Sequence, residues 1–229
     1  MNALLNSSSH TPLRSVDTAK SQRSASLVAG LALAFMAVLA GFGVFGAIQP
    51  SITPGNAEAT AAAILASELM FRLGIASLIL VIVLDVIAAS ALHTLFAPVN
   101  QSLSRMAAWF RLAYSAVFLV AILQLPIAVS LLSEPVAALR AIEAFYTIWN
   151  IGLILFGFHL LLIGYLAFRS GFMAKVFGIL LILAGIGYAV DGFGLVIIPD
   201  FTAFLGQYLF VGEVVLIFWL LIKGRRLTN

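Results

Sequence analysis

The sequence contains no cysteine, and only 9% of its 229 residues are charged. The absence of cysteine excludes a disulfide-stabilised scaffold, a thiol nucleophile and any metal site built on thiolates. The shortage of charge excludes an ordinary water-exposed surface, because soluble domains carry about 25% charged residues. Hydrophobic residues instead make up 63% of the chain. We therefore expect most of the chain to lie in a lipid bilayer.

The formal net charge of +3 does not by itself indicate a nucleic-acid partner. Most Lys and Arg residues flank long apolar runs, which is where membrane orientation places them. The expected partners are therefore the lipid bilayer and either other membrane proteins or a second copy of this chain, with no nucleic acid.

A membrane-spanning helix needs about 20 mostly apolar residues, and the chain contains six runs of this kind. They are Leu27–Ile48, Leu69–Phe96, Met106–Leu132, Ala144–Phe168, Val176–Ile198 and Phe204–Ile222. Short segments rich in Pro, Gly, Asn and Ser separate most of these runs. The sequence therefore predicts one all-α domain at residues 27–222, with six transmembrane helices.

The segments outside these runs differ in character. Residues 1–26 are polar and Ser-rich, which predicts a disordered tail, and residues 223–229 form a basic tail. Residues 57–68 are Ala-rich and follow Asn56, a residue type that often caps helices. They predict a short helix on the outer face.

The positions of the basic residues predict orientation, because cytoplasmic loops carry an excess of Lys and Arg. Nine basic residues fall in the tails and in the loops on the same side, namely Arg14, Lys20, Arg23, Arg105, Arg169, Lys175, Lys223, Arg225 and Arg226. On the other side Arg140 is the clear loop cation. Both termini are therefore predicted to be cytoplasmic. Three tryptophans near the predicted ends of spans are expected to anchor at the membrane surface: Trp109, Trp149 and Trp219.

Four ionisable residues lie inside the apolar runs: Asp85, Arg111, His159 and Glu213. With a rise of about 1.5 Å per residue, Asp85, His159 and Glu213 fall in one layer near the middle of the bilayer. Arg111 starts nearer the cytoplasmic end, and its side chain can extend toward Asp85. Charged groups at this depth cost about 2.5–3.5 kcal/mol each. Two interpretations stay open: a proton relay or charged-solute site, and a salt-bridged cluster that holds the helices together.

A second polar layer is predicted nearer the outside, from Asn150, Asp191 and Gln207. Asp191 lies in a glycine-rich stretch, and glycines recur at every seventh position from Gly178 to Gly192. This spacing favours close helix packing. The alternative is a locally unwound helix whose backbone lines a cavity, as in transporters.

No hydrolase, metalloprotease, P-loop or dinucleotide-binding motif occurs in the chain. One central histidine with scattered acids makes a weak set of metal ligands. We therefore assign no catalytic residue, no metal site and no cofactor, and we favour a protein that is not an enzyme while leaving that question open.

Several motifs resemble a bacterial membrane family known as a domain of unknown function, DUF4386. They are Phe71–Gly74, Leu84–Val86, Pro98–Asn100, Phe110–Leu112, Gly164–Phe172, Gly178–Leu181, Gly187–Asp191, Gly212–Glu213 and Trp219–Leu221. The resemblance covers about residues 27–224. It departs at residues 173–175, where the family pattern has a proline. It implies a six-helix protein of the bacterial inner membrane, and because the family has no established activity it implies no catalytic residue.

Three functions stay open from the sequence. The first is a translocator of a small solute or ion, or a sensor, that uses the layer of Asp85, His159 and Glu213. The second is a structural or accessory membrane protein in which the polar residues only fix helix packing. The third and weakest is an intramembrane enzyme that acts on a lipid.

Overall fold

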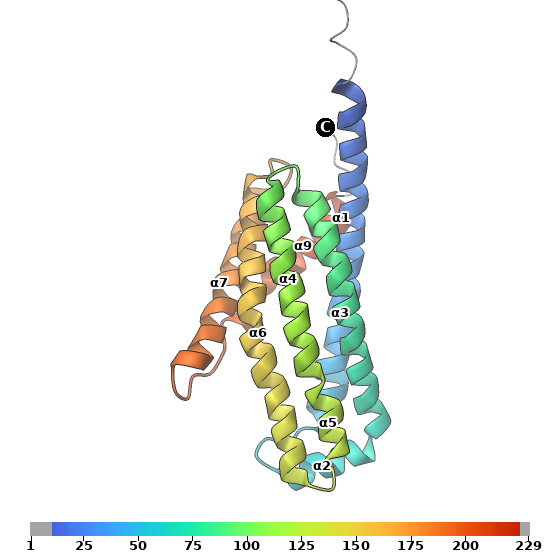
Figure 1. Ribbon diagram of the computed structural model, residues 1–229, viewed down its shortest axis with the longest axis vertical. Helices are drawn as coiled ribbons and strands as arrows, with labels where there is room; N and C mark the ends of the chain where they lie inside the picture. The colour runs from blue at the N-terminus through green and yellow to red at the C-terminus, as the bar shows by residue number, and fades with distance from the viewer. Residues whose placement is uncertain (1–10, 225–229) are drawn as a thin grey trace, which may run out of the picture.

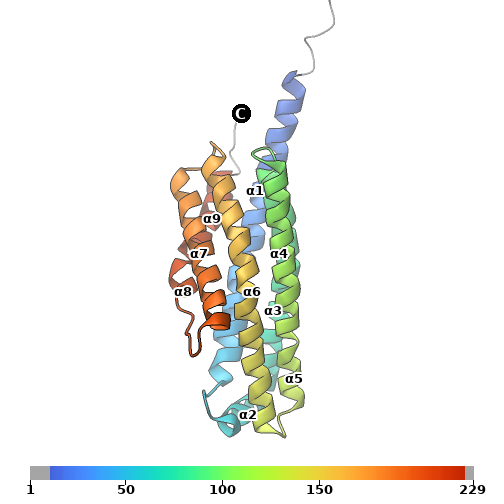
Figure 2. The same ribbon diagram turned by 60° about the vertical axis from the view of Figure 1, so that its left-hand side comes forward.

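The computed structural model describes the backbone of residues 11–224 and, apart from Gln207, the side chains of residues 20–224. This part of the chain is all-helical. Its elements are α1 (Thr11–Gly41), η1 (Phe42–Ile48), η2 (Gln49–Ser51), α2 (Ala57–Ala66), α3 (Glu68–Phe96), α4 (Gln101–Ile122), α5 (Gln124–Ser130), α6 (Pro135–Arg169), α7 (Lys175–Ile197), α8 (Gly206–Leu209) and α9 (Val211–Ile222). The long helices run side by side along the long axis of the molecule (Figures 1 and 2).

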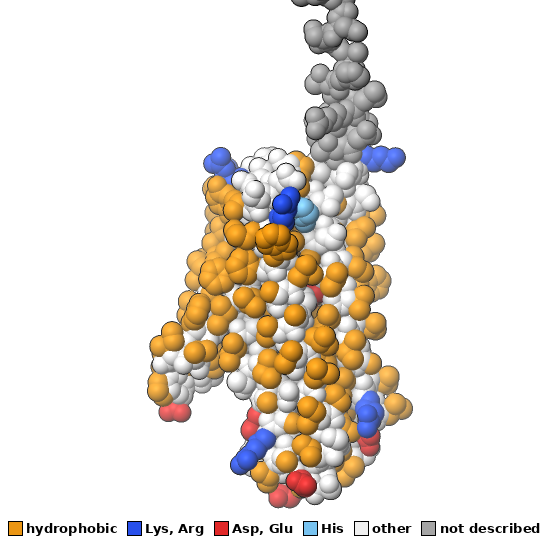
Figure 3. Space-filling view, viewed as in Figure 1, with side chains coloured by type: hydrophobic (Ala, Val, Ile, Leu, Met, Phe, Trp, Pro, Cys, Tyr) orange, Lys and Arg blue, Asp and Glu red, His pale blue; other side chains and the backbone are white. Residues whose placement is uncertain are grey.

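Five helical segments are long and apolar enough to cross a membrane. They are Lys20–Ser51, Glu68–Phe96, Gln101–Ser130, Pro135–Arg169 and Lys175–Ile197. Hydrophobic side chains cover the visible face of the bundle between its ends, and charged side chains gather at the two ends (Figure 3). These features agree with the all-α membrane protein that the sequence predicts.

The sixth predicted span, Phe204–Ile222, is not one continuous helix. Its residues form α8 and α9, which meet at Phe210. The 12 residues of α9 extend over only about 18 Å, which is short of the roughly 30 Å of a hydrocarbon core. The structure therefore contains five candidate spans where the sequence predicts six.

A side chain of α7 holds the start of this predicted span as a loop. The two carboxylate oxygens of Asp191 accept hydrogen bonds from the backbone N–H groups of Phe204, at 3.2 Å, and Gly206, at 2.7 Å. These bonds hold the segment before α8 as a loop against α7. Hydropathy cannot predict these hydrogen bonds, because they join residues that are 13 and 15 positions apart in the sequence.

The first helix begins earlier than the sequence predicts. Helix α1 starts at Thr11, so residues 11–26 are helical where we predicted a disordered tail. Neither Gly nor Pro occurs between Leu13 and Val28, so nothing stops the helix of the first span from continuing outward. The first ten residues of the predicted tail, and residues 225–229 of the basic tail, lie outside the described residues.

The short helix predicted at residues 57–68 corresponds to α2, which ends two residues earlier, at Ala66, and Glu68 already begins α3. The Asn56 side chain caps it by accepting a hydrogen bond from the backbone N–H of Ala59 at 3.0 Å. This cap supplies a partner for one of the free N–H groups at the start of the helix.

The recurring glycines of α7 form a close contact with α6. A Cβ atom on Gly178 would lie 2.6 Å from the carbonyl oxygen of Gly164, and one on Gly185 would lie 2.6 Å from the carbonyl oxygen of Gly157. Such distances are shorter than real Cβ contacts, so only glycine lets the two backbones approach this closely. Because α7 is helical from Lys175 to Ile197, the structure supports close packing and not a locally unwound helix.

Candidate functional site

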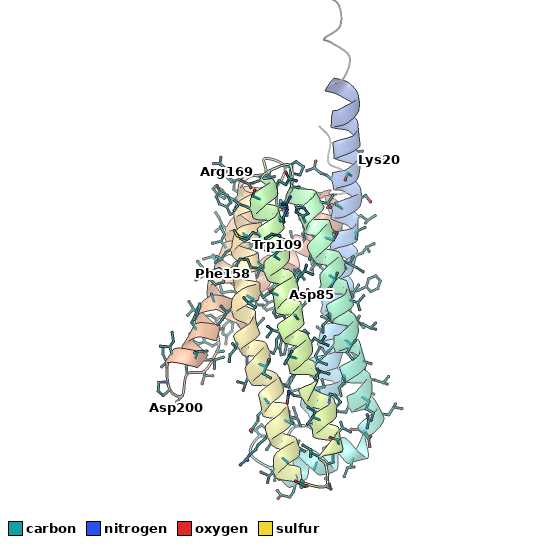
Figure 4. All side chains as sticks on the ribbon, viewed as in Figure 1. Lys20, Asp85, Trp109, Phe158, Arg169 and Asp200 are labelled. Carbon is teal, nitrogen blue, oxygen red and sulfur yellow. The ribbon has the colours of Figure 1, made fainter. Side chains whose placement is uncertain are left out.

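A cavity of about 410 Å³ lies within the bundle. Its walls come from α1, η1, α3, α4, α6, α7 and α9, together with Phe210 between α8 and α9. All four ionisable residues of the predicted central layer line it, namely Asp85, Arg111, His159 and Glu213. Asp85 lies roughly midway along the bundle, between Arg169 near one end and Asp200 toward the other (Figure 4). Counting depth along the sequence therefore identified side chains that share one space.

Arg111 is the centre of the polar wall. Its Nη2 lies 2.7 Å from Oδ1 of Asp85, and both side chains are almost fully buried, at 2% and 1% exposure. This confirms the contact that the sequence predicts between the two residues. The Arg111 guanidinium also lies over the ring of Phe156, 5.3 Å from its centroid.

The structure gives His159 two hydrogen-bond partners. Its Nε2 lies 3.1 Å from Nη1 of Arg111, and its Nδ1 lies 2.9 Å from the carbonyl oxygen of Ala107. A carbonyl only accepts and a guanidinium only donates. Nδ1 therefore carries the hydrogen, Nε2 accepts, and the imidazole is neutral. Asp85, Arg111 and His159, which we call the buried triad, thus connect α3, α4 and α6.

Three polar atoms of the buried triad have no hydrogen-bond partner among the described residues. They are Oδ1 and Oδ2 of Asp85 and Nε of Arg111. Oδ1 of Asp85 is nevertheless close enough to Arg111 to form an ion pair. Buried polar atoms are nearly always paired in folded proteins. The buried triad therefore keeps unused capacity to bind a polar group.

Glu213 faces the same cavity from α9 and is not part of the triad. The hydroxyl of Tyr188 on α7 donates a hydrogen bond to its Oε1 at 2.8 Å. Among the described side chains Glu213 forms no ion pair. The cavity therefore holds two carboxylates and one guanidinium, with Glu213 as the acid that lacks a cationic partner.

Aromatic side chains that the sequence analysis did not assign to the site form much of the remaining wall. The indole Nε1 of Trp149 donates to the hydroxyl of Tyr114 at 3.0 Å, and both rings line the cavity. The prediction that Trp149 anchors at the membrane surface is therefore wrong. Trp219 is also buried and stacks on Phe172, whereas Trp109 is 63% exposed as an anchor would be.

The position of Tyr188 in the sequence could have identified it as a candidate site residue. It lies one helical turn before Asp191 in the glycine-rich stretch. Its hydroxyl is therefore a polar group inside the same predicted span.

The second predicted layer comes together only in part. Asn150 and Asp191 line a smaller cavity of about 130 Å³ together with Tyr188. Both oxygens of Asp191 are engaged by the backbone before α8, so this residue has a structural task. The side chain of Gln207 lies outside the described residues.

Two side chains that line the larger cavity, Phe45 of η1 and Phe210 before α9, are 71% and 45% exposed. We infer from this exposure that the cavity opens beside them, between η1 and the start of α9. Helix α1 contacts α9 near the other end of α9, where Ser26 Oγ donates to the Leu220 carbonyl at 3.0 Å. The exposed rings lie in the apolar part of the bundle, so the opening faces the region that lipid would occupy.

The side chains described include no group of three or more His, Asp or Glu residues placed to hold a metal ion. The chemistry available in the cavity is hydrogen bonding, ion pairing and contact with apolar and aromatic surface.

Comparison with known proteins identifies the family. Residues 28–224 match the family model described as a domain of unknown function, DUF4386. A relative called "Uncharacterized protein" from Archaeoglobus fulgidus is 37% identical over 155 residues, which is 68% of this chain and 86% of the relative. That relative is archaeal, whereas the sequence resemblance implied a bacterial family. No solved structure matches the chain. Because the family model covers most of its length, the chain belongs to the DUF4386 family.

Proposed function

We propose that this protein is a multi-pass membrane protein that binds a small solute in the central cavity and acts as its translocator or sensor. The observation that carries the proposal is the convergence of Asp85, Arg111, His159 and Glu213 on one space of about 410 Å³. Ligand sites are typically apolar cavities of about 300–1,000 Å³ with a few placed polar groups. This cavity has that size and that composition.

The polar residues divide between two tasks under this proposal. The buried triad fixes the positions of three helices, because Arg111 contacts both Asp85 and His159. Glu213 is half-buried, and its hydrogen bond comes from the movable hydroxyl of Tyr188. We assign solute contact to Glu213, with the unpaired Nε of Arg111 and Oδ2 of Asp85 as further polar contacts.

A structural or accessory role is the second candidate, and the buried triad favours it. Three mutually bonded side chains on three helices are what a cluster kept for packing requires. In that case the partner is another membrane protein or a second copy of this chain. The third function named above, an intramembrane enzyme acting on a lipid, has no observation in its favour.

We further propose that the end of the bundle bearing Lys20 and Arg169 faces the cytoplasm, in the bacterial inner membrane. Helices α1 and α9 both reach this end (Figure 1), which would place both termini inside. In this arrangement α8 and α9 complete a sixth, interrupted crossing. The positive-inside rule supports this orientation, since Arg169 and Lys20 share one end of the bundle whereas Asp200 points toward the other (Figure 4).

The absence of cysteine allows a direct test with single-cysteine variants. We expect Val214→Cys, which lines the cavity, to react in membranes with a hydrophobic cationic methanethiosulfonate reagent, one whose charged group carries apolar substituents. Val38→Cys is the matched control, because Val38 is 69% exposed on α1 and does not line the cavity. It should stay unreactive in lipid. Equal lack of reaction at both positions would overturn the solute-binding proposal and favour the structural role.

The same approach tests orientation. Gln101→Cys lies at the start of α4 and Thr202→Cys lies in the loop between α7 and α8. In intact cells an impermeant maleimide should label Thr202→Cys and not Gln101→Cys. The reverse pattern would contradict the proposed orientation.

A further inference from the structure

We propose that the solute bound in the central cavity is a hydrophobic organic cation, held by the carboxylate of Glu213 and by aromatic ring faces. This inference rests on the proposed function and names the chemical class of its ligand. It is carried by the charge of the cavity, the nature of its walls and the direction of its opening.

The first step is the charge of the cavity. The positive charge of Arg111 is matched by Asp85, which lies 2.7 Å away. The imidazole of His159 is neutral, because its two nitrogens donate to the Ala107 carbonyl and accept from Arg111. With Glu213 ionised, the described lining carries one net negative charge. A cationic ligand balances it at a depth where an isolated charge is costly.

The second step is the character of the walls. The lining includes seven Phe, Tyr and Trp side chains: Phe45, Tyr114, Phe118, Trp149, Phe156, Tyr188 and Phe210. Aromatic faces attract cations and form the usual recognition sites for substituted ammonium groups. The same principle is already seen inside the cavity, where the Arg111 guanidinium lies 5.3 Å above the centre of the Phe156 ring.

The lining residues also favour an organic cation over a bare inorganic one. A bare inorganic cation such as Mg²⁺ or Ca²⁺ takes about six or more oxygen ligands at short range. The described residues offer no group of three or more acids and histidines for such an ion. A cation that carries its own apolar groups needs only one acid and an apolar enclosure. The cavity provides both.

The third step is access. The cavity opens past Phe45 and Phe210, which are 71% and 45% exposed in the apolar part of the bundle. A ligand that enters there comes from the lipid and must itself be soluble in lipid. A hydrophobic cation meets this requirement, whereas a strongly hydrated one does not.

Paired probes that differ only in charge test the inference. The full chain in lipid nanodiscs is dialysed against labelled phenyltrimethylammonium, and separately against labelled tetraphenylphosphonium, with empty nanodiscs subtracted. We expect saturable binding of at least one cation. We expect tert-butylbenzene, which has the shape of phenyltrimethylammonium without its charge, and the anion tetraphenylborate to displace the bound cation at least about tenfold less well than the unlabelled cation.

Variants then place the binding at Glu213. Glu213→Gln should weaken cation binding by about tenfold or more, and Glu213→Asp should restore part of it. Asp200→Asn removes an acid outside the cavity and should leave binding unchanged. Unfolding temperatures of the same samples show whether each variant is folded.

The outcomes separate this inference from the proposed function. If tert-butylbenzene binds as well as the cations, or if Glu213→Gln binds them unchanged, the cavity is a ligand site but the cationic class is wrong. If the cations bind less well than tetraphenylborate, the charge assignment is wrong. If no probe of any charge binds saturably, both the inference and the proposed function fail.

Discussion

Arg111 and His159 meet through Nη1 and Nε2, which are 3.1 Å apart, and this contact decides where the imidazole keeps its hydrogen. Nε2 must accept, so the hydrogen is on Nδ1 and points to the Ala107 carbonyl, 2.9 Å away. The histidine at the centre of the membrane layer therefore acts as a fixed connection between α4 and α6. It is not the free proton carrier that a relay requires.

This role predicts a graded response at position 159. His159→Phe leaves a guanidinium N–H without an acceptor and should lower the free energy of unfolding by about 1–3 kcal/mol. His159→Gln keeps an amide oxygen that can accept from Arg111 and should lose less. Thermal unfolding in the same detergent measures both, with about 2–4 °C expected per kcal/mol. Equal losses for the two variants would contradict the assigned acceptor role.

The ion pair between Asp85 and Arg111 should show strong coupling. Asp85→Leu or Arg111→Met alone leaves a buried charge unpaired and should cost about 3–5 kcal/mol. The double variant removes both charges, so its loss should be smaller than the sum of the two single losses. Chemical denaturation of the four proteins completes the cycle. Additive losses would mean that the two side chains do not stabilise each other.

The glycine contact between α6 and α7 predicts a steric penalty. Gly178→Ala adds a Cβ atom 2.6 Å from the Gly164 carbonyl oxygen and from the backbone nitrogen of Phe168, and it should destabilise by about 1–3 kcal/mol. Gly41→Ala is the control, because nothing lies within 4 Å of its Cβ position and alanine favours a helix. A Gly178→Ala protein as stable as the Gly41→Ala protein would contradict the close packing.

The loop before α8 should depend on Asp191. Asp191→Asn replaces one acceptor oxygen by an NH₂ group, so one of the bonds to the backbone N–H groups of Phe204 and Gly206 is lost. Hydrogen exchange of these amides should become faster, while exchange in α3 stays unchanged. Asp200→Asn changes a nearby acid that lies in the turn after α7 and should have no such effect. Unchanged exchange in the Asp191→Asn protein would show that the loop is held by other contacts.

The sequence predicted the depth of the central site in the membrane better than the contacts between its side chains. Apolar runs and a constant helical rise were sufficient to place Asp85, His159 and Glu213 in one layer, and all three line one cavity. Pairing depends on how each helix is rotated about its axis, and a single sequence reports that weakly. The contact of Tyr188 with Glu213 was missed for this reason, and so was the second bond of Arg111, to His159.

The fold shows the same division. The recurring glycines predicted a tightly packed α7, because a missing Cβ is a property of the residue itself. The interruption at Phe210 and the π-helical segment Phe42–Ile48 were not predicted. Asp191 explains the loop before α8, because its side chain accepts from the backbone N–H groups of Phe204 and Gly206. The π-helical segment contributes Val44 and Phe45 to the wall of the cavity, and π-helical turns are frequent at functional sites.

The most direct test of the account compares the unfolding temperatures of Asp85→Asn, His159→Phe and Glu213→Gln with that of the parent protein in the same detergent. The buried triad holds helices together, so the first two variants should unfold at lower temperature. Glu213 is assigned to ligand contact, and groups kept for function tend to be neutral or destabilising in the empty protein. Glu213→Gln should therefore unfold at the parent's temperature or above. A loss at Glu213 as large as that at Asp85 would contradict the account and make the whole layer structural.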